Sequence, residues 1–125
     1  MRYFTGQGFI VHGALGVEGQ PPPAPVRNDG YGSAKPRTPD VVAFDTVRKR
    51  VVFGLVRPDK ESLSSEESLE EYNVFLDHNH NLGEQASAVF VLLPDLLLQE
   101  FTSVITHYVH REYWHRIIPV CAEPQ

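Results

Sequence analysis

The sequence predicts an α/β fold in which helices flank a mixed central sheet. From residue 40 onward, short apolar segments rich in β-branched residues alternate with longer segments of helical periodicity, as in such folds. The length of 125 residues and the apolar content of 42% suit a single domain over residues 1–125. The one cysteine, Cys121, excludes an internal disulfide and a cysteine-based zinc site.

The first third of the chain is predicted to be mostly loop. Residues 8–13, GFIVHG, favour a short strand, and residues 13–39 hold most of the glycine and proline. Because proline fixes φ and lacks an N–H, the segment PPPAP at 21–25 is typical of neither a helix nor a central strand. We therefore expect a long surface loop over residues 13–39, of a kind that is often either functional or disordered.

Residues 40–57 predict a β-hairpin. The segments DVVAFD at 40–45 and VVFGLV at 51–56 are apolar and β-branched, and the charged segment TVRKR at 46–50 is the turn between them. Gly54 interrupts the second strand, and it predicts a bulge or a close backbone approach.

Residues 62–77 predict one helix. Ser64 and Glu67 have the spacing of a capping box, and glutamates in the first turns suit the positive end of the helix dipole. Four larger residues recur at helical spacing and predict the face that packs on the core. They are Leu69, Tyr72, Phe75 and Leu76.

After a loop at 78–85, residues 86–120 predict a strand, a helix and a last strand. The strands are ASAVFVLL at 86–93 and HRIIPV at 115–120, and Pro119 is expected to end the second one. Pro94 and Asp95 open the helix, since proline is tolerated in a first turn. The predicted core stripe of this helix consists of Leu97, Phe101, Val104, Ile105 and Tyr108.

The net charge of −5 is unevenly distributed. Residues 27–60 carry eight basic and four acidic side chains, whereas residues 61–77 carry six acidic and no basic ones. The basic 27–60 region could hold a phosphate backbone, so nucleic acid is one candidate partner. A protein partner or a homodimer is the other candidate, and a simple solvated surface explains the same charges.

The sequence gives no sign of export or membrane insertion. The segment MRYFTGQGF has no apolar core and no cleavage site of a secretory signal. No run approaches the roughly 20 apolar residues that cross a bilayer. With its single cysteine, the chain is expected to be a cytoplasmic protein without membrane contact.

Pro39-Asp40 at the head of an apolar hairpin, followed by a helix and a strand, resembles the PD-(D/E)xK nuclease superfamily over roughly residues 8–93. The resemblance implies a restriction-endonuclease-like core. In that family the aspartate and an acid on the next strand hold Mg²⁺, which activates water and neutralises the scissile phosphate. A lysine two residues beyond the acid faces the same side of the strand, because side chains alternate along it.

The chain departs from that pattern on its second strand. Asp40 matches the aspartate, but the acid and the lysine fall on Leu55 and Arg57. Leucine cannot ligate a metal, and arginine keeps its proton, so it can clamp phosphate but not act as a base. A displaced acid would have to complete a Mg²⁺ site.

The resemblance implies Asp40, Arg57, Asp59 and Glu70 as candidate catalytic residues, with Asp40 and Asp59 as the metal ligands. Glu61 and Glu71 are further candidate acids. The preferred interpretation is a non-catalytic nuclease fold that serves as an interaction or nucleic-acid-associated module and needs no cofactor. A divergent Mg²⁺-dependent nuclease is the alternative. Arg57 could equally be a surface charge, or pair with Asp40 or Asp59 where the metal would lie.

Histidines form a second candidate site. Five of the six lie late in the chain: His78, His80, His107, His110 and His115. His107 and His110 are three apart and would share a face of the predicted helix. A zinc site needs three or four converging ligands, and exposed histidines in loops and at helix ends explain the same pattern.

Overall fold

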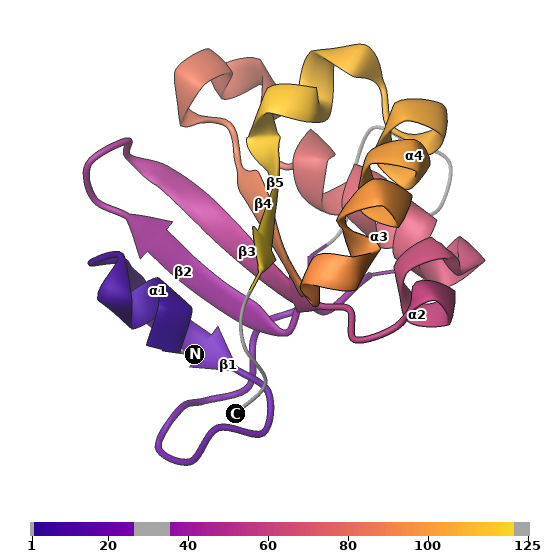
Figure 1. Cartoon of the computed structure of the whole chain (residues 1–125). Helices are drawn as coiled ribbons and strands as arrows, with labels where there is room; N and C mark the ends of the chain where they lie inside the picture. Colours follow the sequence, from indigo (N-terminus) through magenta and orange to yellow (C-terminus); the bar gives the residue numbers. More distant parts are fainter. Residues whose placement is uncertain (1, 27–35, 122–125) are drawn as a thin grey trace.

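The computed structural model describes residues 2–26 and 36–121, and its centre is a five-stranded sheet in the order β1-β2-β3-β4-β5 (Figure 1). The first three strands are antiparallel neighbours, and β4 and β5 run parallel to β3. The predicted mixed α/β sheet is therefore confirmed. The strands are β1 Ile10–Ala14, β2 Val41–Asp45, β3 Arg50–Val56, β4 Ala88–Leu93 and β5 Ile117–Cys121.

Helices cover both faces of the sheet, and α2, α3 and α4 lie together on one of them (Figure 1). The short helix α1 packs on the other face and was not predicted from the sequence. No helix among the described residues is long and apolar enough to cross a membrane. The α-helices are α1 Arg2–Gly6, α2 Lys60–Ser64, α3 Glu66–Asp77 and α4 Leu98–Tyr108. The 3₁₀ segments are η1 His80–Gln85, η2 Asp95–Leu97 and η3 Arg111–Arg116.

The two faces of β3 and β4 are both buried, which explains why these strands are almost continuously apolar. One face packs against α2, α3 and α4 through side chains that include Phe53, Leu55, Leu63, Phe75 and Ile105. The other face packs against α1 through side chains that include Phe4, Val41, Val52, Ala88 and Phe90.

Gly54 is the point of closest approach between α1 and the sheet. A Cβ at Gly54 would lie 2.5 Å from Cζ of Phe4 and 3.0 Å from Cβ of Val41. Glycine at this position therefore leaves room for the Phe4 ring. The close contact is made by a side chain and not by a second backbone, and β3 pairs with both neighbours without a bulge, so neither predicted alternative holds as stated. The register shift lies elsewhere, in β1 between Val11 and Gly13.

The predicted single helix over 62–77 is wrong, because the helix is interrupted at Ser65. Asp59 caps α2 by accepting the Ser62 N–H at 2.8 Å, and Ser65 caps α3 by accepting the Ser68 N–H at 3.1 Å. Ser65 has extended backbone angles, φ −64° and ψ 154°. The Ser64–Glu67 capping box is therefore also wrong. Serine-rich segments offer several competing caps, and packing selects among them.

The C-terminal part follows the predicted order with shifted boundaries. A 3₁₀ turn, η2, precedes α4, and η3 precedes β5. The predicted core stripe of α4 is wrong at Tyr108, which is 59% exposed. Pro119 lies inside β5 and does not end it, because an edge strand tolerates the missing N–H.

The predicted loop over 13–39 is described only in part, since residues 27–35 lie outside the described ranges. Val26 and Arg37 form an isolated antiparallel bridge. This bridge places Arg37 close to the head of β2.

Candidate functional site

Asp40 lies directly before β2 and is tied to the end of β3. Its N–H donates to the carbonyl oxygen of Gly54 at 3.0 Å, and its Oδ2 accepts the N–H of Val56 at 2.8 Å. The antiparallel register, in which Val41 faces Gly54, thus places the Asp40 carboxylate beside the residue that follows β3. That residue is Arg57.

The Arg57 guanidinium lies between two carboxylates. One terminal nitrogen, Nη1, is 3.6 Å from Oδ2 of Asp40, and Nη2 donates to Oε1 of Glu71 at 2.7 Å. The Arg57 side chain is only 10% exposed, and its guanidinium lies 5.8 Å from the centre of the Tyr72 ring. Of the alternatives that the sequence left open for Arg57, the structure shows the pairing with Asp40, and the largely buried side chain is not a surface charge.

A second ion pair borders the first. Arg37 Nη2 contacts Oε2 of Glu70 at 2.5 Å, and the Arg37 side chain is 11% exposed. We call the five residues Asp40, Arg57, Glu71, Arg37 and Glu70 the Arg57 cluster.

The pKa of Glu71, within this cluster, is shifted from its ordinary value. Burial raises the pKa of Glu71 above its ordinary value, and the guanidinium groups of Arg57 and Arg37 lower it in part. The carboxylates of Asp40 and Glu67 raise it again.

The predicted acids have different positions in the structure. Glu70 belongs to the cluster but pairs with Arg37, and Glu71 is the acid that contacts Arg57. Asp59 caps α2, and the exposed Glu61 lies on the first turn of that helix. The structure therefore does not bring Asp59 to Asp40 in any contact.

Sequence reasoning missed Arg37. The available signal was its place in KPRTPD, three residues before Asp40. The bridge between Val26 and Arg37 is what directs this arginine to the cluster, and a contact with Glu70 across 33 residues has no signature in the local sequence.

The cluster does not fit Mg²⁺ as it stands. Asp40 and Glu71 both face the Arg57 guanidinium, which supplies a permanent positive charge between them. Leu55, which the predicted resemblance aligns with the second metal ligand, is 1% exposed and packs in the apolar core. Across residues 2–26 and 36–121, no group of three or more His, Cys, Asp or Glu side chains is placed to hold a metal ion.

Most described basic residues of the 27–60 region contact an acid. Arg48 and Arg50 lie 3.6 Å and 3.9 Å from Oδ2 of Asp45, and Lys60 lies 3.2 Å from Glu100. Arg27 and Lys35 lie outside the described residues. The local excess of positive charge is therefore largely compensated within the fold.

The histidines do not converge on a metal site. Since α4 ends at Tyr108, the predicted shared helix of His107 and His110 is wrong, and His110 instead caps η3. His107 contacts the carbonyl oxygen of Ser103, one turn back on α4, at 2.7 Å.

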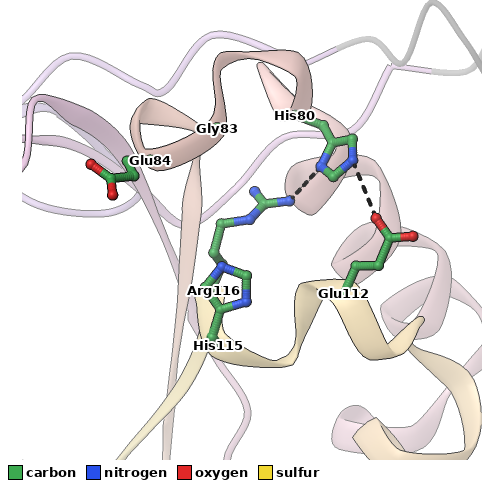
Figure 2. A pocket seen from close by; sticks show the side chains of 6 residues that line it. All are labelled: His80, Gly83, Glu84, Glu112, His115 and Arg116. Atoms are coloured by element: carbon green, nitrogen blue, oxygen red, sulfur yellow. Dashed lines mark hydrogen bonds and ion pairs between the residues drawn. The ribbon is translucent and has the colours of Figure 1, made fainter.

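An open cavity of about 400 Å³ lies between η1 and η3 (Figure 2). His80 lies between Arg116 Nη2, 3.0 Å from its Nδ1, and Glu112 Oε2, 3.7 Å from its Nε2. Because arginine only donates, Nδ1 accepts and the neutral ring carries its proton on Nε2. The lining residues are His80, Gly83, Glu84, Glu112, His115 and Arg116.

Arg116 has a structural role at this cavity. It is 3% exposed, and its Nη1 donates to the carbonyl oxygens of Leu76 at 2.9 Å and Ser87 at 2.6 Å. These bonds join η3 to the end of α3 and the start of β4. The cavity therefore lies where η1 and η3 meet, and its Arg116 and His80 side chains already have partners within the fold.

No protein-family model, no curated protein and no solved structure matches this chain.

Proposed function

We propose that the chain is a catalytically inactive domain with a restriction-endonuclease-like core that binds a protein partner and does not cleave nucleic acid. One observation carries this proposal: the Arg57 guanidinium bridges Asp40 and Glu71, where a nuclease of this superfamily would hold its metal. The hairpin, the aspartate before its first strand and the helix that follows support the resemblance.

The chemistry of the cluster supports the absence of catalysis. Hydrolysis of a phosphodiester in this superfamily needs carboxylates that are free to ligate Mg²⁺ and a group that can take a proton. Asp40 and Glu71 already neutralise an arginine, and the arginine cannot take a proton. The buried Leu55 supplies no oxygen ligand.

The charge distribution favours a protein over a nucleic acid as partner. Affinity for a phosphate backbone depends on lysine and arginine side chains that neutralise phosphates and so release the counterions of the nucleic acid. Here Arg37, Arg57 and Lys60 each contact a carboxylate, and the net charge of the chain is −5.

The direct test is cleavage of supercoiled plasmid, single-stranded DNA and RNA in Mg²⁺ or Mn²⁺, comparing the native chain with Asp40→Ala. We expect no cleavage by either protein. Metal-dependent cleavage that disappears in Asp40→Ala would overturn the proposal. It would favour the alternative, a divergent nuclease in which Glu71 acts with Asp40 after Arg57 is displaced.

A restoration experiment tests the nuclease-like core itself. Leu55→Glu with Arg57→Lys rebuilds the acid-x-lysine pattern, and Leu55→Gln with Arg57→Lys is the matched control without the added carboxylate. We expect Mn²⁺ to raise the melting temperature of the first variant and not of the control, since a ligand that binds only the folded state stabilises it. Circular dichroism first establishes that both variants fold, since Leu55 is buried. Equal responses of the two folded variants would refute the resemblance at this position.

A further inference from the structure

The segment QPPPAPV at residues 20–26 has the composition of a polyproline-II helix. Proline fixes φ near the value of that conformation, and a residue before proline is driven to extended angles. Neither α-helix nor strand is assigned over residues 21–25, although they belong to the described part of the chain. A polyproline-II helix has three residues per turn and no internal hydrogen bonds, so its outer edges are free for recognition.

The burial of this segment repeats every third residue. Pro23 and Val26 are buried and Gln20 is half-buried. The two residues between Gln20 and Pro23, and the two between Pro23 and Val26, are exposed. They are Pro21, Pro22, Ala24 and Pro25. This is the pattern of a three-residue helix that rests on the fold along one edge and presents the other two edges outward.

The fold holds this segment in place at both ends. The carbonyl oxygen of Pro21 accepts the N–H of Ala14 at 3.0 Å, and Val26 exchanges two backbone hydrogen bonds with Arg37 at 2.7 and 2.9 Å. Between these anchors, Pro23 packs so closely on Gly13 that a Cβ there would lie 3.0 Å from Cα of Pro23. The segment is thus ordered before any partner binds, which lowers the entropic cost of association.

We propose that residues 21–26 form a displayed polyproline ligand for a protein domain of the SH3 type, whose groove is lined by aromatic side chains. Pro22 and Pro25 have the PxxP spacing that such grooves receive, and both are exposed. In the sequence Arg27 follows directly, so a groove with acidic residues beside its aromatic ones complements the segment. This interaction goes beyond the proposed function and does not depend on whether Asp40 binds a metal.

Binding of the full chain to a panel of purified SH3 domains tests the proposal, with each domain first shown to bind a synthetic PxxP peptide. We expect at least one domain to bind the full chain, and Pro22→Ala with Pro25→Ala to weaken that binding at least tenfold. The matched control is Pro94→Ala with Pro119→Ala, two exposed prolines elsewhere in the fold, which should leave the affinity unchanged.

Nuclear magnetic resonance of the ¹⁵N-labelled chain locates the contact. Prolines have no N–H, so the signals of Gln20, Ala24 and Val26 are the reporters, and they should shift on addition of the bound domain. The Pro22→Ala, Pro25→Ala variant should still melt in one cooperative transition, because both side chains are exposed. Its midpoint should be somewhat lower, because alanine leaves the unfolded chain freer than proline does. Absence of binding to every domain of the panel would overturn the proposal, as would binding that survives this substitution, and the segment would then serve only to cover β1.

Discussion

Arg57 is the residue on which the Arg57 cluster depends, because its largely buried guanidinium contacts two carboxylates. Removing one partner of a buried ion pair leaves uncompensated charge, which costs more than the pair itself contributes. The contribution of each described arginine to the free energy of unfolding therefore depends on the exposed fraction of its side chain.

Arg57→Ala should lower the free energy of unfolding by about 3–5 kcal/mol, because Asp40 and Glu71 lose their shared cation. Arg48→Ala is the control, since Arg48 also pairs with an aspartate but its side chain is 64% exposed. It should cost about 1 kcal/mol or less. Urea denaturation measures both values, and equal losses would contradict the role assigned to burial.

Asp45 makes the stability of the fold depend on pH, and the direction of that dependence follows from its pKa. Its carboxylate is 1% exposed, and burial acts to raise its pKa. Hydrogen bonds from the backbone N–H groups of Arg48 and Val47 lower the pKa, and so do the positive charges of Arg50 and Arg48. Their combined effect exceeds that of burial, so the pKa lies below its ordinary value of 3.8. The ionised form therefore stabilises the fold above that ordinary value, and this contribution is lost as the pH falls through the lower folded-state pKa.

Asp45→Asn should accordingly lower the free energy of unfolding by roughly 3 kcal/mol at pH 7, because Arg50 is left without its buried counter-charge. The difference from the native chain should narrow as the pH falls below the ordinary pKa of aspartate. Denaturation curves at a series of pH values measure this difference, and a gap that stays constant down to strongly acidic pH would disprove the assignment.

Among the elements, the break between α2 and α3 shows how local caps compete. Ser64 and Ser65 are neighbours, and serine is a favoured helix cap, although only Ser64 was predicted as one. Only Ser65 accepts a backbone N–H as the cap of α3, whereas the Ser64 hydroxyl donates to the carbonyl oxygen of Lys60 at 2.9 Å.

Ser65→Ala should therefore destabilise the protein by about 1 kcal/mol through the lost cap. Ser64→Ala should change the stability by less than about 0.5 kcal/mol, because its hydroxyl is exposed and satisfies only a helical carbonyl. Thermal melting of the two variants compares them, and the reverse order would restore the Ser64 cap predicted from the sequence.

The packing of α1 on β3 depends on the missing side chain of Gly54. Gly54→Ala should destabilise the fold by about 1–3 kcal/mol, since its methyl group would overlap the Phe4 ring. Combining it with Phe4→Ala should cost less than the sum of the two single substitutions, because the smaller residue removes the clash. A double-mutant cycle measures this coupling, and strictly additive losses would contradict the contact.

At the scale of the whole molecule, charge compensation limits what the surface can bind. The chain carries −5 overall, and the described basic residues of β2, β3 and their flanks mostly contact acids. A labelled DNA duplex at about 150 mM salt should bind with a dissociation constant weaker than roughly 100 µM, the weak end of non-specific affinities. Fluorescence anisotropy measures it, and micromolar binding with a steep salt dependence would revive the nucleic-acid hypothesis.

The sequence by itself determined the two strands of the hairpin, and it offered the pairing of Asp40 with Arg57 as one of several alternatives. These features depend on β-branched composition and on a short turn, and both act between residues that are near in sequence. Once β2 and β3 pair in antiparallel register, Asp40 and Arg57 must lie beside each other.

Only the tertiary structure decided which acid meets Arg57. Glu70 and Glu71 are consecutive and point in different directions around α3, so the rotation of the helix selects between them. That rotation follows from the burial of Tyr72, Phe75 and Leu76 against the sheet. The arrival of Arg37 and the one-sided exposure of residues 21–26 likewise depend on contacts between distant parts of the chain, which a local pattern does not encode.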